Sequence, residues 1–246
     1  MRACQNRSPS GGDPLMSDIF AVPRLPSPTV AVAGTTLRFP VRRIYCVGRN
    51  YAEHAREMGA PVERETPTFF MKPADAVVAD GATLAYPSST SNLHHEVELV
   101  VALGGGGANV DREDALGHVF GYAVGIDLTR RDLQAASKAK GLPWDTSKGF
   151  DGSAPISAIH RADLIGHPTY GELAIVVNGE ARQRADIGEM IFDVPAIIHE
   201  LSKLFELAAG DLIFTGTPAG VGPLVRGDHV VATFSDVARL QLRIGD

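Results

Sequence analysis

The chain has 246 residues, of which 44% are hydrophobic, and a formal net charge of −6. This length suffices for one large domain or two small ones, and we predict a single catalytic domain. The acidic balance and the lack of a lysine or arginine run argue against nucleic acid or an anionic membrane as partner. No stretch approaches eighteen consecutive apolar residues, so we expect no membrane span. Two cysteines, Cys4 and Cys46, make no disulfide framework, which fits a reducing cytoplasm, and Cys46 in the apolar run RIYCVG is predicted to be a buried, unreactive thiol.

The N-terminal part of the chain differs in composition from the rest. Residues 1–16 are polar, rich in proline and glycine, and lack the apolar centre of a signal peptide. We expect a disordered tail there. Because a second methionine, Met16, follows this stretch, a mis-assigned start codon is another explanation for its composition. Residues 17–40 are Pro-rich with short β-like pieces such as TVAVAG, which predicts a small wrapping segment ahead of a catalytic domain over residues 41–246.

The catalytic domain begins with a strand and a short helix. The apolar stretch over residues 42–48 predicts the strand. Asn50 and Glu53 form a capping-box pattern that predicts a helix over residues 51–58, and Gly59 is the expected end of that helix.

The predicted helix carries a histidine–glutamate pair. His54 and Glu57 are three residues apart and so share one face, where the carboxylate could orient the imidazole as a base. Surface pairs of this kind are common, so the spacing alone does not decide in favour of catalysis.

The stretch NLHHEVELVVALGGGG, residues 92–107, places four ionisable side chains in an otherwise apolar strand. The strand period puts His94, Glu96 and Glu98 on one face and His95 with the apolar residues on the other. The four glycines predict a turn, and without a following helix signal or Gly-Lys-Ser/Thr they do not predict a phosphate site.

Two glutamates on one strand face, roughly 7 Å apart at their Cα atoms, repel each other unless they are solvated or hold a cation. A solvated edge strand is the simpler interpretation. A third carboxylate, Asp127, ends the apolar run YAVGID and favours a metal site formed with Glu96 and Glu98. The stretch is not the His-Glu-x-x-His zinc pattern, and an all-carboxylate set favours Mg²⁺, with Mn²⁺ or Ca²⁺ as alternatives.

A second helix is expected directly after Asp127. Thr129 and Asp132 form another capping-box pattern, which opens the helix RRDLQAASKAKG. On this helix Arg131 and Gln134 share a face and could reach an anionic group on a bound ion.

The remaining stretches complete the predicted fold. Lys148 follows in a loop, where a solvated lysine is the alternative to a functional one. Later segments are a hairpin around Asn178-Gly179, an amphipathic helix over residues 194–207, and closing strands over residues 210–218 and 227–234. Strands outnumber helices without regular alternation, so the predicted class is α+β with a mixed, mostly antiparallel sheet.

Seven stretches occur in order along the chain: YCVGRNYAEHAREMG, FFMKPADAVV, NLHHEVELVV, GIDLTRRDLQ, GLPWDTSKGFD, GEMIFDVPAIIHELS and LIFTGTPAGVGP. Together they resemble the fumarylacetoacetate hydrolase superfamily, within it the acylpyruvases, and most closely the bacterial fumarylpyruvate hydrolases. The resemblance runs from about Phe39 to the C-terminus.

The resemblance implies a β-sandwich roll, a homodimer, and a short helix that acts as a lid between Gly48 and Gly59. It also implies roles for individual residues, with His94 and His95 as neighbours of the site. Those roles are a water-activating dyad of His54 and Glu57, a divalent ion held by Glu96, Glu98 and Asp127, and substrate or oxyanion contacts from Lys148, Arg131, Gln134 and Thr217.

The implied activity is Mg²⁺-dependent hydrolysis of the carbon–carbon bond of a 3-acylpyruvate, with fumarylpyruvate giving fumarate and pyruvate as in gentisate breakdown. The partner is then a small 2-oxo diacid, and Arg49 or Arg56 is the candidate for its distal carboxylate. Rival readings are an oxaloacetate decarboxylase, a hydroxymuconate-type diacid decarboxylase or isomerase, and a non-catalytic diacid-binding protein. No Gly-x-Ser-x-Gly stretch supports a serine nucleophile.

Overall fold

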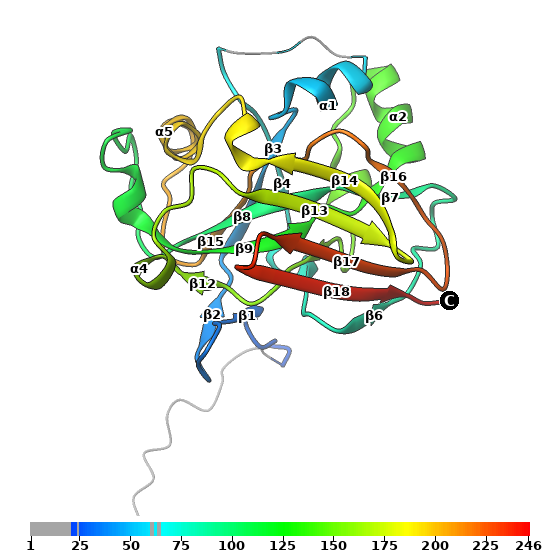
Figure 1. Cartoon of the computed structure of the whole chain (residues 1–246), viewed down its shortest axis with the longest axis horizontal. Coiled ribbons are helices and arrows are strands. Elements are labelled where there is room, and N and C mark those ends of the chain that lie inside the picture. Colours follow the sequence, from blue (N-terminus) through cyan, green and yellow to red (C-terminus); the bar gives the residue numbers. More distant parts are fainter. Residues whose placement is uncertain (1–20, 24, 60–61, 63–64) are drawn as a thin grey trace, which may run out of the picture.

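The computed structural model of this chain describes residues 21–23, 25–59, 62 and 65–246 (Figure 1). The predicted tail, residues 1–16, lies outside this part of the chain, as do Cys4 and the first four residues of the predicted wrapping segment. The division into tail, wrapping segment and catalytic domain therefore stays a prediction.

The larger of two main sheets is mixed and has six strands. β15 runs parallel to β3, and the other neighbouring pairs are antiparallel. In spatial order the strands are β12 (His160–Arg161), β9 (Val119–Ile126), β8 (Val97–Leu103), β15 (Asp211–Phe214), β3 (Arg43–Gly48) and β4 (Thr68–Lys72).

The second sheet has five strands and lies in front of the first in Figure 1. Only the pairing of β18 with β6 is parallel among its pairs. In spatial order the strands are β14 (Glu180–Asp186), β13 (Glu172–Val177), β17 (His229–Phe234), β18 (Ala238–Ile244) and β6 (Ala82–Leu84). These two sheets confirm the predicted α+β class with mostly antiparallel sheets.

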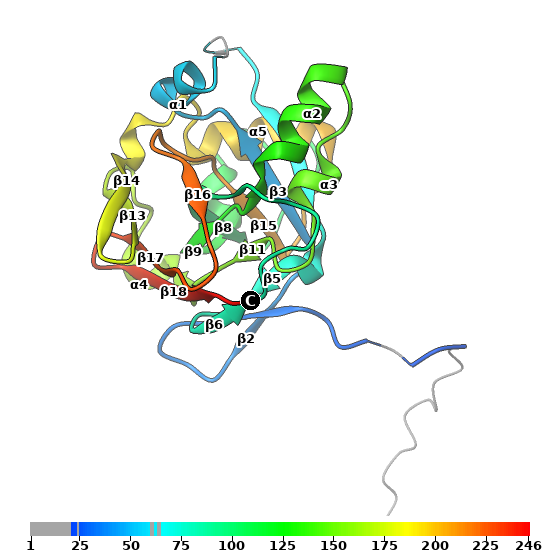
Figure 2. The same cartoon turned by 90° about the vertical axis from the view of Figure 1, so that its right-hand side faces the viewer.

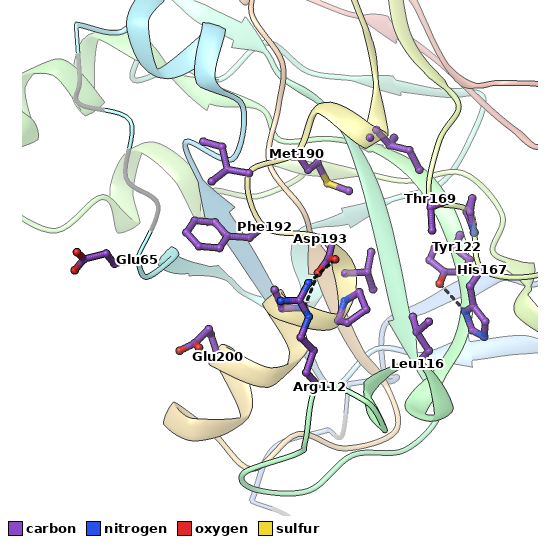
Figure 3. A pocket seen from close by; sticks show the side chains of 17 residues that line it. Glu65, Arg112, Leu116, Tyr122, His167, Thr169, Met190, Phe192, Asp193 and Glu200 are labelled. Carbon is purple, nitrogen blue, oxygen red and sulfur yellow. Dashed lines mark hydrogen bonds and ion pairs between the residues drawn. The ribbon is translucent and has the colours of Figure 1, made fainter.

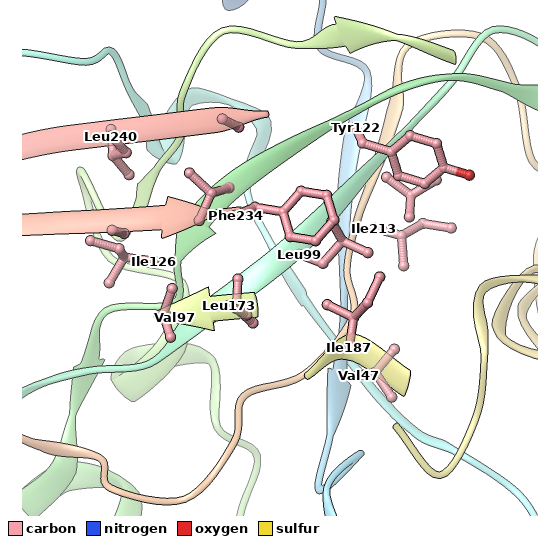
Figure 4. Close-up of a cluster of buried hydrophobic side chains, with 14 of the residues drawn as sticks. Val47, Val97, Leu99, Tyr122, Ile126, Leu173, Ile187, Ile213, Phe234 and Leu240 are labelled. Carbon is pink, nitrogen blue, oxygen red and sulfur yellow. The ribbon is translucent and has the colours of Figure 1, made fainter. Parts of the chain in front are cut away.

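The main hydrophobic core fills the space between the two sheets, as Figure 4 shows. Leu99 and Ile126 of the first sheet meet Leu173, Phe234 and Leu240 of the second, and all five are buried. Burial of this apolar area is the main stabilising contribution to the sandwich.

The opposite face of the six-stranded sheet is also covered. Val100 and Ala102 of β8 belong to a second buried cluster, together with Val30 and Phe39 from the N-terminal hairpin. β8 is therefore a central strand buried on both faces, which accounts for its continuous apolar run. The alternative of a solvated edge strand for residues 92–103 is wrong.

The remaining strands form three small sheets, and the helices are short. The sheets are β1 (Thr29–Ala31) with β2 (Arg38–Pro40), β10 (Thr129–Arg130) with β7 (Leu93–His95) and β16 (Gly222–Leu224), and β11 (Ala154–Pro155) with β5 (Val77–Val78). The α-helices are α1 (Ala52–Glu57), α2 (Arg131–Lys140), α3 (Asp145–Lys148), α4 (Ala162–Ile165) and α5 (Val194–Leu204), and the 3₁₀ turns are η1 (Ala74–Ala76), η2 (Ala115–His118) and η3 (Ile187–Glu189).

The predicted hairpin and the two longer predicted helices are confirmed, although α5 ends at Leu204, before the predicted residue 207. The turn between β13 and β14 places Asn178 and Gly179 at φ values of 53° and 85°, the positive values that a two-residue hairpin turn requires. α5 begins at the Asp193 cap, whose side chain accepts a hydrogen bond from Ala196 N at 2.9 Å. α2 ends at Gly141, whose φ is 63°.

Both predicted capping boxes are wrong. The side chain of Asn50 donates instead to Phe192 O at 2.9 Å and Thr215 O at 2.8 Å, and it accepts from Phe192 N at 2.7 Å. The hydroxyl of Thr129 lies against the Lys148 ammonium at 2.7 Å. In both cases tertiary hydrogen bonds outweigh the local capping preference, because the side chains are completely buried.

Several elements were not expected from the sequence. The chain closes on β18, beyond the last predicted strand, and the segments of α3 and α4 were not assigned to helices. Lys148 is accordingly the last residue of a short helix, and the loop placement predicted for it is wrong. Figures 1 and 2 both show α1 and α2 at the same end of the molecule. Among the described residues no helix is long and apolar enough to cross a membrane.

Candidate active site

The three predicted metal ligands meet at one end of the six-stranded sheet. Glu96 lies in the break between β7 and β8, Glu98 is the second residue of β8, and Asp127 follows the last residue of β9. Backbone pairing fixes their register, since Asp127 N donates to Glu96 O at 2.8 Å. One carboxylate oxygen of each residue lies within 4.8 Å of the others, and all three residues are buried.

Lys148 lies among these carboxylates. Its Nζ is 2.8 Å from Glu96 Oε2, 2.5 Å from Asp127 Oδ2 and 2.7 Å from Thr129 Oγ1. Burial alone would lower the pKa of Lys148, but the charges of Asp127 and Glu96 outweigh it and raise the pKa. Lys148 is therefore a charged member of the site, and a solvated lysine is excluded.

A second buried lysine, Lys72 at the end of β4, was not assigned a role from the sequence. Its Nζ lies 2.7 Å from Asp127 Oδ1, and it also donates to the backbone carbonyls of Leu128 and Lys148. The available signal was its position after three apolar residues in the motif FFMKPADAVV, because a fully buried lysine requires a carboxylate or carbonyl partners.

The donor set fits a divalent cation. Asp127 Oδ1 accepts no hydrogen bond among the described residues, although Lys72 lies close to it. Burial, together with the charges of Asp127 and Glu96, raises the pKa of Glu98 well above its ordinary value. Glu98 has no lysine or arginine partner among the described residues, and a hard, oxygen-preferring ion would relieve the repulsion among the three buried carboxylates, so Glu96, Glu98 and Asp127 form a divalent metal site.

Arg131 and Gln134 share the face of α2 that points toward Glu96. The Arg131 guanidinium donates to Glu96 Oε1 and, at 2.6 Å, to Gln134 Oε1. Burial would raise the pKa of Glu96, but the positive charges of Lys148 and Arg131 hold it well below its usual range.

His54 and Glu57 form the predicted pair on α1. His54 Nδ1 lies 3.2 Å from Glu57 Oε2, and Glu57 also accepts from Gly220 N at 3.1 Å. Because Nδ1 faces the carboxylate, Nε2 is left as the basic nitrogen. Burial lowers the pKa of His54, while Glu96 and Glu57 offset part of this effect. The imidazole is therefore neutral near pH 7, as a general base must be.

Thr217 of the TGTP loop lines the cavity of the site, and the substrate contact that the resemblance implied for it stays a prediction. Thr217 Oγ1 donates to Val97 O at 2.8 Å and accepts from Gln183 Nε2 at 2.8 Å. Its single hydroxyl proton is thus already engaged. The neighbouring Gly216 N donates to Glu98 Oε2 at 2.8 Å, so this loop positions a metal ligand.

The two histidines before Glu96 lie beside the site on opposite faces, as predicted. His94 Nδ1 is 3.4 Å from Arg131 Nε, and burial with the Arg131 charge lowers the pKa of His94 to about 4. His95 Nδ1 contacts Gln183 Oε1 at 2.9 Å on the other face.

The two arginines proposed for a distal carboxylate are in different surroundings. Arg49 lines the site, its φ is 61°, and its buried Nε has no hydrogen-bond partner in the described part of the chain. Arg56 is exposed and lies 3.6 Å from Glu53, away from the cavity. Only Arg49 is placed to meet a ligand.

All the predicted site residues except Glu57 and Arg56 line one cavity, whose volume is about 30 Å³. That volume holds no more than a few water molecules, whereas a small-molecule site needs roughly 300 Å³ or more. Met58 next to α1 lines this cavity, as do Phe70 and Trp144, so the site is nearly closed in this conformation.

A much larger cavity, of about 550 Å³, lies elsewhere, beside the N-terminal end of α5 (Figure 3). Four of its polar side chains pair with one another, with Tyr122 Oη 2.7 Å from His167 Nδ1 and Arg112 Nη2 2.7 Å from Asp193 Oδ2. The carboxylate cluster, the His54–Glu57 pair and Lys148 all lie outside it, so its size does not make it the reaction site.

Comparison with known proteins identifies relatives over most of the chain. The family model described as fumarylacetoacetate (FAA) hydrolase C-terminal matches residues 43–245. The crystal structure of fumarylpyruvate hydrolase from Pseudomonas aeruginosa in complex with Mn²⁺ and pyruvate has a TM-score of 0.89 and 48% sequence identity, covering 92% of this chain and 99% of that chain.

Two relatives carry other activities in their names. The mitochondrial oxaloacetate tautomerase FAHD1 of Mus musculus is 43% identical over 203 residues, which cover 82% of this chain and 91% of the relative. The mitochondrial oxaloacetate decarboxylase of Dictyostelium discoideum is 43% identical over 190 residues, covering 77% of this chain and 87% of the relative.

Proposed function

The chain belongs to the fumarylacetoacetate hydrolase family of metal-dependent enzymes, and on that premise we propose that it hydrolyses a 3-acylpyruvate with Mg²⁺, cleaving fumarylpyruvate to fumarate and pyruvate. One observation carries the proposal. The His54 imidazole, backed by Glu57, lines the same cavity as the three carboxylates, which brings a water-activating base and a cation site together.

The ion would be held by Glu96, Glu98 and Asp127 and would stabilise negative charge on the oxygens of the 2-oxo acid end of the substrate. Lys72 and Lys148 pair with the two carboxylate oxygens of Asp127 and hold the side chain in place. Lys148, being charged and buried, also stabilises negative charge that develops beside it, an electrostatic contribution commonly worth about 3 kcal/mol per donor.

His54 acts as the base in the bond-breaking step. Its Nε2 takes a proton from water while the water oxygen bonds to the distal acyl carbon. The bond from that carbon to the adjacent methylene carbon then breaks, and its electron pair leaves on the pyruvate part as an enolate. The proton returns from His54 to the enolate carbon, which gives pyruvate. The acyl part leaves as fumarate after the second proton of the attacking water, now on the new carboxyl group, is lost to solvent.

A second candidate is the tautomerisation or decarboxylation of oxaloacetate. It is favoured by the names of the relatives from Mus musculus and Dictyostelium discoideum. These reactions use the same 2-oxo acid end and an enolate but need no attacking water. The intact His54–Glu57 pair favours hydrolysis over them, and with Lys148 it disfavours a non-catalytic diacid-binding protein.

Product identification tests the proposal. The purified protein with Mg²⁺ is incubated with fumarylpyruvate and followed by proton NMR. We expect equal amounts of fumarate and pyruvate, loss of the reaction with EDTA, and recovery on adding excess Mg²⁺. Uncleaved fumarylpyruvate, with Mg²⁺-dependent turnover of oxaloacetate alone, would overturn hydrolysis in favour of the second candidate.

A further inference from the structure

One face of α2 presents three polar side chains to the reaction cavity. Arg131, Gln134 and Lys138 are spaced at i, i+3 and i+7, so they align along the helix, and all three line the cavity. Arg131 and Gln134 bind each other, and Arg131 also binds Glu96. Lys138, one turn farther from the carboxylates, was not assigned a role from the sequence.

The surroundings of Lys138 hold its ammonium group without supplying a counter-charge. Its Nζ lies 5.2 Å from the centre of the Trp144 ring, and Trp144 packs edge-on against Phe70 with centroids 5.8 Å apart. A cation over an aromatic face is attracted to it, which positions the ammonium beside the cavity.

Arg49 supplies a second unpaired cation to the same cavity. Its backbone has a φ of 61°, a conformation that costs energy for a residue with a side chain, and it directly precedes the anchored Asn50. Arg49 Nε is buried without a hydrogen-bond partner in the described residues. A guanidinium with a buried donor that has no partner can form a charge-assisted hydrogen bond to a bound anion.

The carboxylates of the site do not form ion pairs with Arg49 or Lys138. Within the part of the chain that the structure describes, Glu96 and Asp127 pair with Lys72, Arg131 and Lys148, and no ion pair involves Arg49 or Lys138. Burial, followed by the charges of Arg131 and Arg49, lowers the pKa of Lys138 to about 8. The end of the cavity away from the carboxylate cluster is therefore electropositive.

We infer that Lys138 and Arg49 together bind the second carboxylate of a 2-oxo diacid and make the enzyme selective for diacids over monoacids. The inference rests on the proposed function for the 2-oxo acid end of the ligand, which lies at the carboxylate cluster. The far carboxylate then neutralises two cations that otherwise repel each other, so its charge-assisted hydrogen bonds come with relief of that repulsion.

Calorimetry with two unreactive probes of equal length tests this assignment. 2-Oxoadipate and 2-oxohexanoate differ only in the distal carboxylate, and both are titrated into the Mg²⁺-loaded protein. We expect the parent to bind the diacid at least about tenfold more tightly, the effect of one charge-assisted contact. Lys138→Met should reduce this ratio about tenfold while leaving 2-oxohexanoate affinity within twofold.

Matched variants separate charge from folding. Lys140→Met, on the exposed side of the same helix, should keep the parental ratio, and Lys138→Arg should retain most of it. A parental ratio in Lys138→Met, or a parent that does not discriminate, would overturn the inference. These outcomes are distinct from failure of the proposed function, which is read from the products of fumarylpyruvate and not from probe binding.

Discussion

The carboxylates of the site are compensated unequally by the side chains around them. Asp127 lies against Lys72 and Lys148, and Glu96 lies against Lys148 and Arg131. Glu98 accepts a backbone hydrogen bond from Gly216 and pairs with no lysine or arginine among the described residues. It is therefore the ligand that most lacks a positive charge when no ion is bound.

We expect Glu98→Gln to weaken Mg²⁺ binding by more than about tenfold, because it removes one of three anionic ligands. The neutral amide also relieves repulsion from Asp127 and Glu96, so the metal-free variant should be at least as stable as the metal-free parent. Calorimetry and thermal unfolding, with and without Mg²⁺, measure both effects. Glu113→Gln, at an exposed position, is the control, and parental Mg²⁺ affinity in Glu98→Gln would refute the ligand assignment.

Substitution of His54 should affect hydrolysis and decarboxylation differently, since only hydrolysis needs an activated water. His54→Ala should lower acylpyruvate hydrolysis about 10²-fold or more, the range for lost general-base catalysis. Any oxaloacetate decarboxylation should fall less. Glu53→Ala on the exposed face of α1 is the control. Equal losses in both reactions would mean that His54 positions the substrate or holds the helix closed.

We predict that the affinity for a diacid depends on pH through the titration of Lys138. Its pKa of about 8 is below the ordinary lysine value, so the ammonium is present below about pH 8 and is lost as the pH rises through it. The affinity for 2-oxoadipate should therefore fall between pH 7 and pH 9.5, whereas that for 2-oxohexanoate should change less. Lys138→Arg, whose guanidinium stays charged, should remove the difference, and a decline that persists in this variant would assign it to another group.

Helix α1 is held in place at its N-terminal side, but most of its side chains are not buried. Asn50 holds its N-terminal side through three buried hydrogen bonds, and Tyr51 forms a β-bridge with Met190. Beyond this anchor only His54 and Ala55 of the helix are buried. The cavity of about 30 Å³ beneath it is too small for a diacid, so a substrate can enter only if α1 or its neighbours move.

The sequence suggested a lid over residues 49–60, of which residue 60 lies outside the described part of the chain. Because the contacts of Asn50 and Tyr51 hold the start of this segment in place, we expect only α1 and Gly59 to move. The amides of Met58 and Gly59 bond to carbonyls of the helix itself, and the amide of Ala55 bonds to the carbonyl of Tyr51 just before it. We expect them to exchange rapidly in the free protein and slowly with Mg²⁺ plus oxalate, which mimics the enolate end. Slow exchange without ligand would remove the lid hypothesis.

Most of the fold could be predicted from the periodicity of apolar residues and from turn residues. The Asn178-Gly179 hairpin and the amphipathic α5 follow from local spacing, and the structure contains both. Glu96 and Glu98 meet as the strand period predicted, although the predicted continuous strand is interrupted at Glu96, between β7 and β8. Local patterns failed where tertiary partners decide. Asn50 and Thr129 have capping sequences but bind distant groups instead.

The site divides in the same way. The carboxylates could be predicted because their strand spacing is local and like charges on one face demand a cation. The sequence around Lys72 indicated only a buried lysine in need of a partner, and nothing indicated Lys138, because their roles depend on β4 and α2 meeting β9 and Trp144 in three dimensions. The homodimer implied by the resemblance likewise depends on surfaces outside one chain and stays a prediction.

The enzyme is proposed to hydrolyse a dianionic acylpyruvate, and its preference among three substrates tests this proposal. The measurement is kcat/KM of the purified, Mg²⁺-loaded parent for fumarylpyruvate, acetylpyruvate and oxaloacetate under one set of conditions. We predict that fumarylpyruvate exceeds acetylpyruvate by at least about tenfold, equivalent to roughly 1.4 kcal/mol from the distal carboxylate, and also exceeds oxaloacetate. Arg49→Ala should shrink the gap between the two acylpyruvates, and the outward-facing Arg56→Ala should not. Faster turnover of oxaloacetate or acetylpyruvate than of fumarylpyruvate would contradict the account.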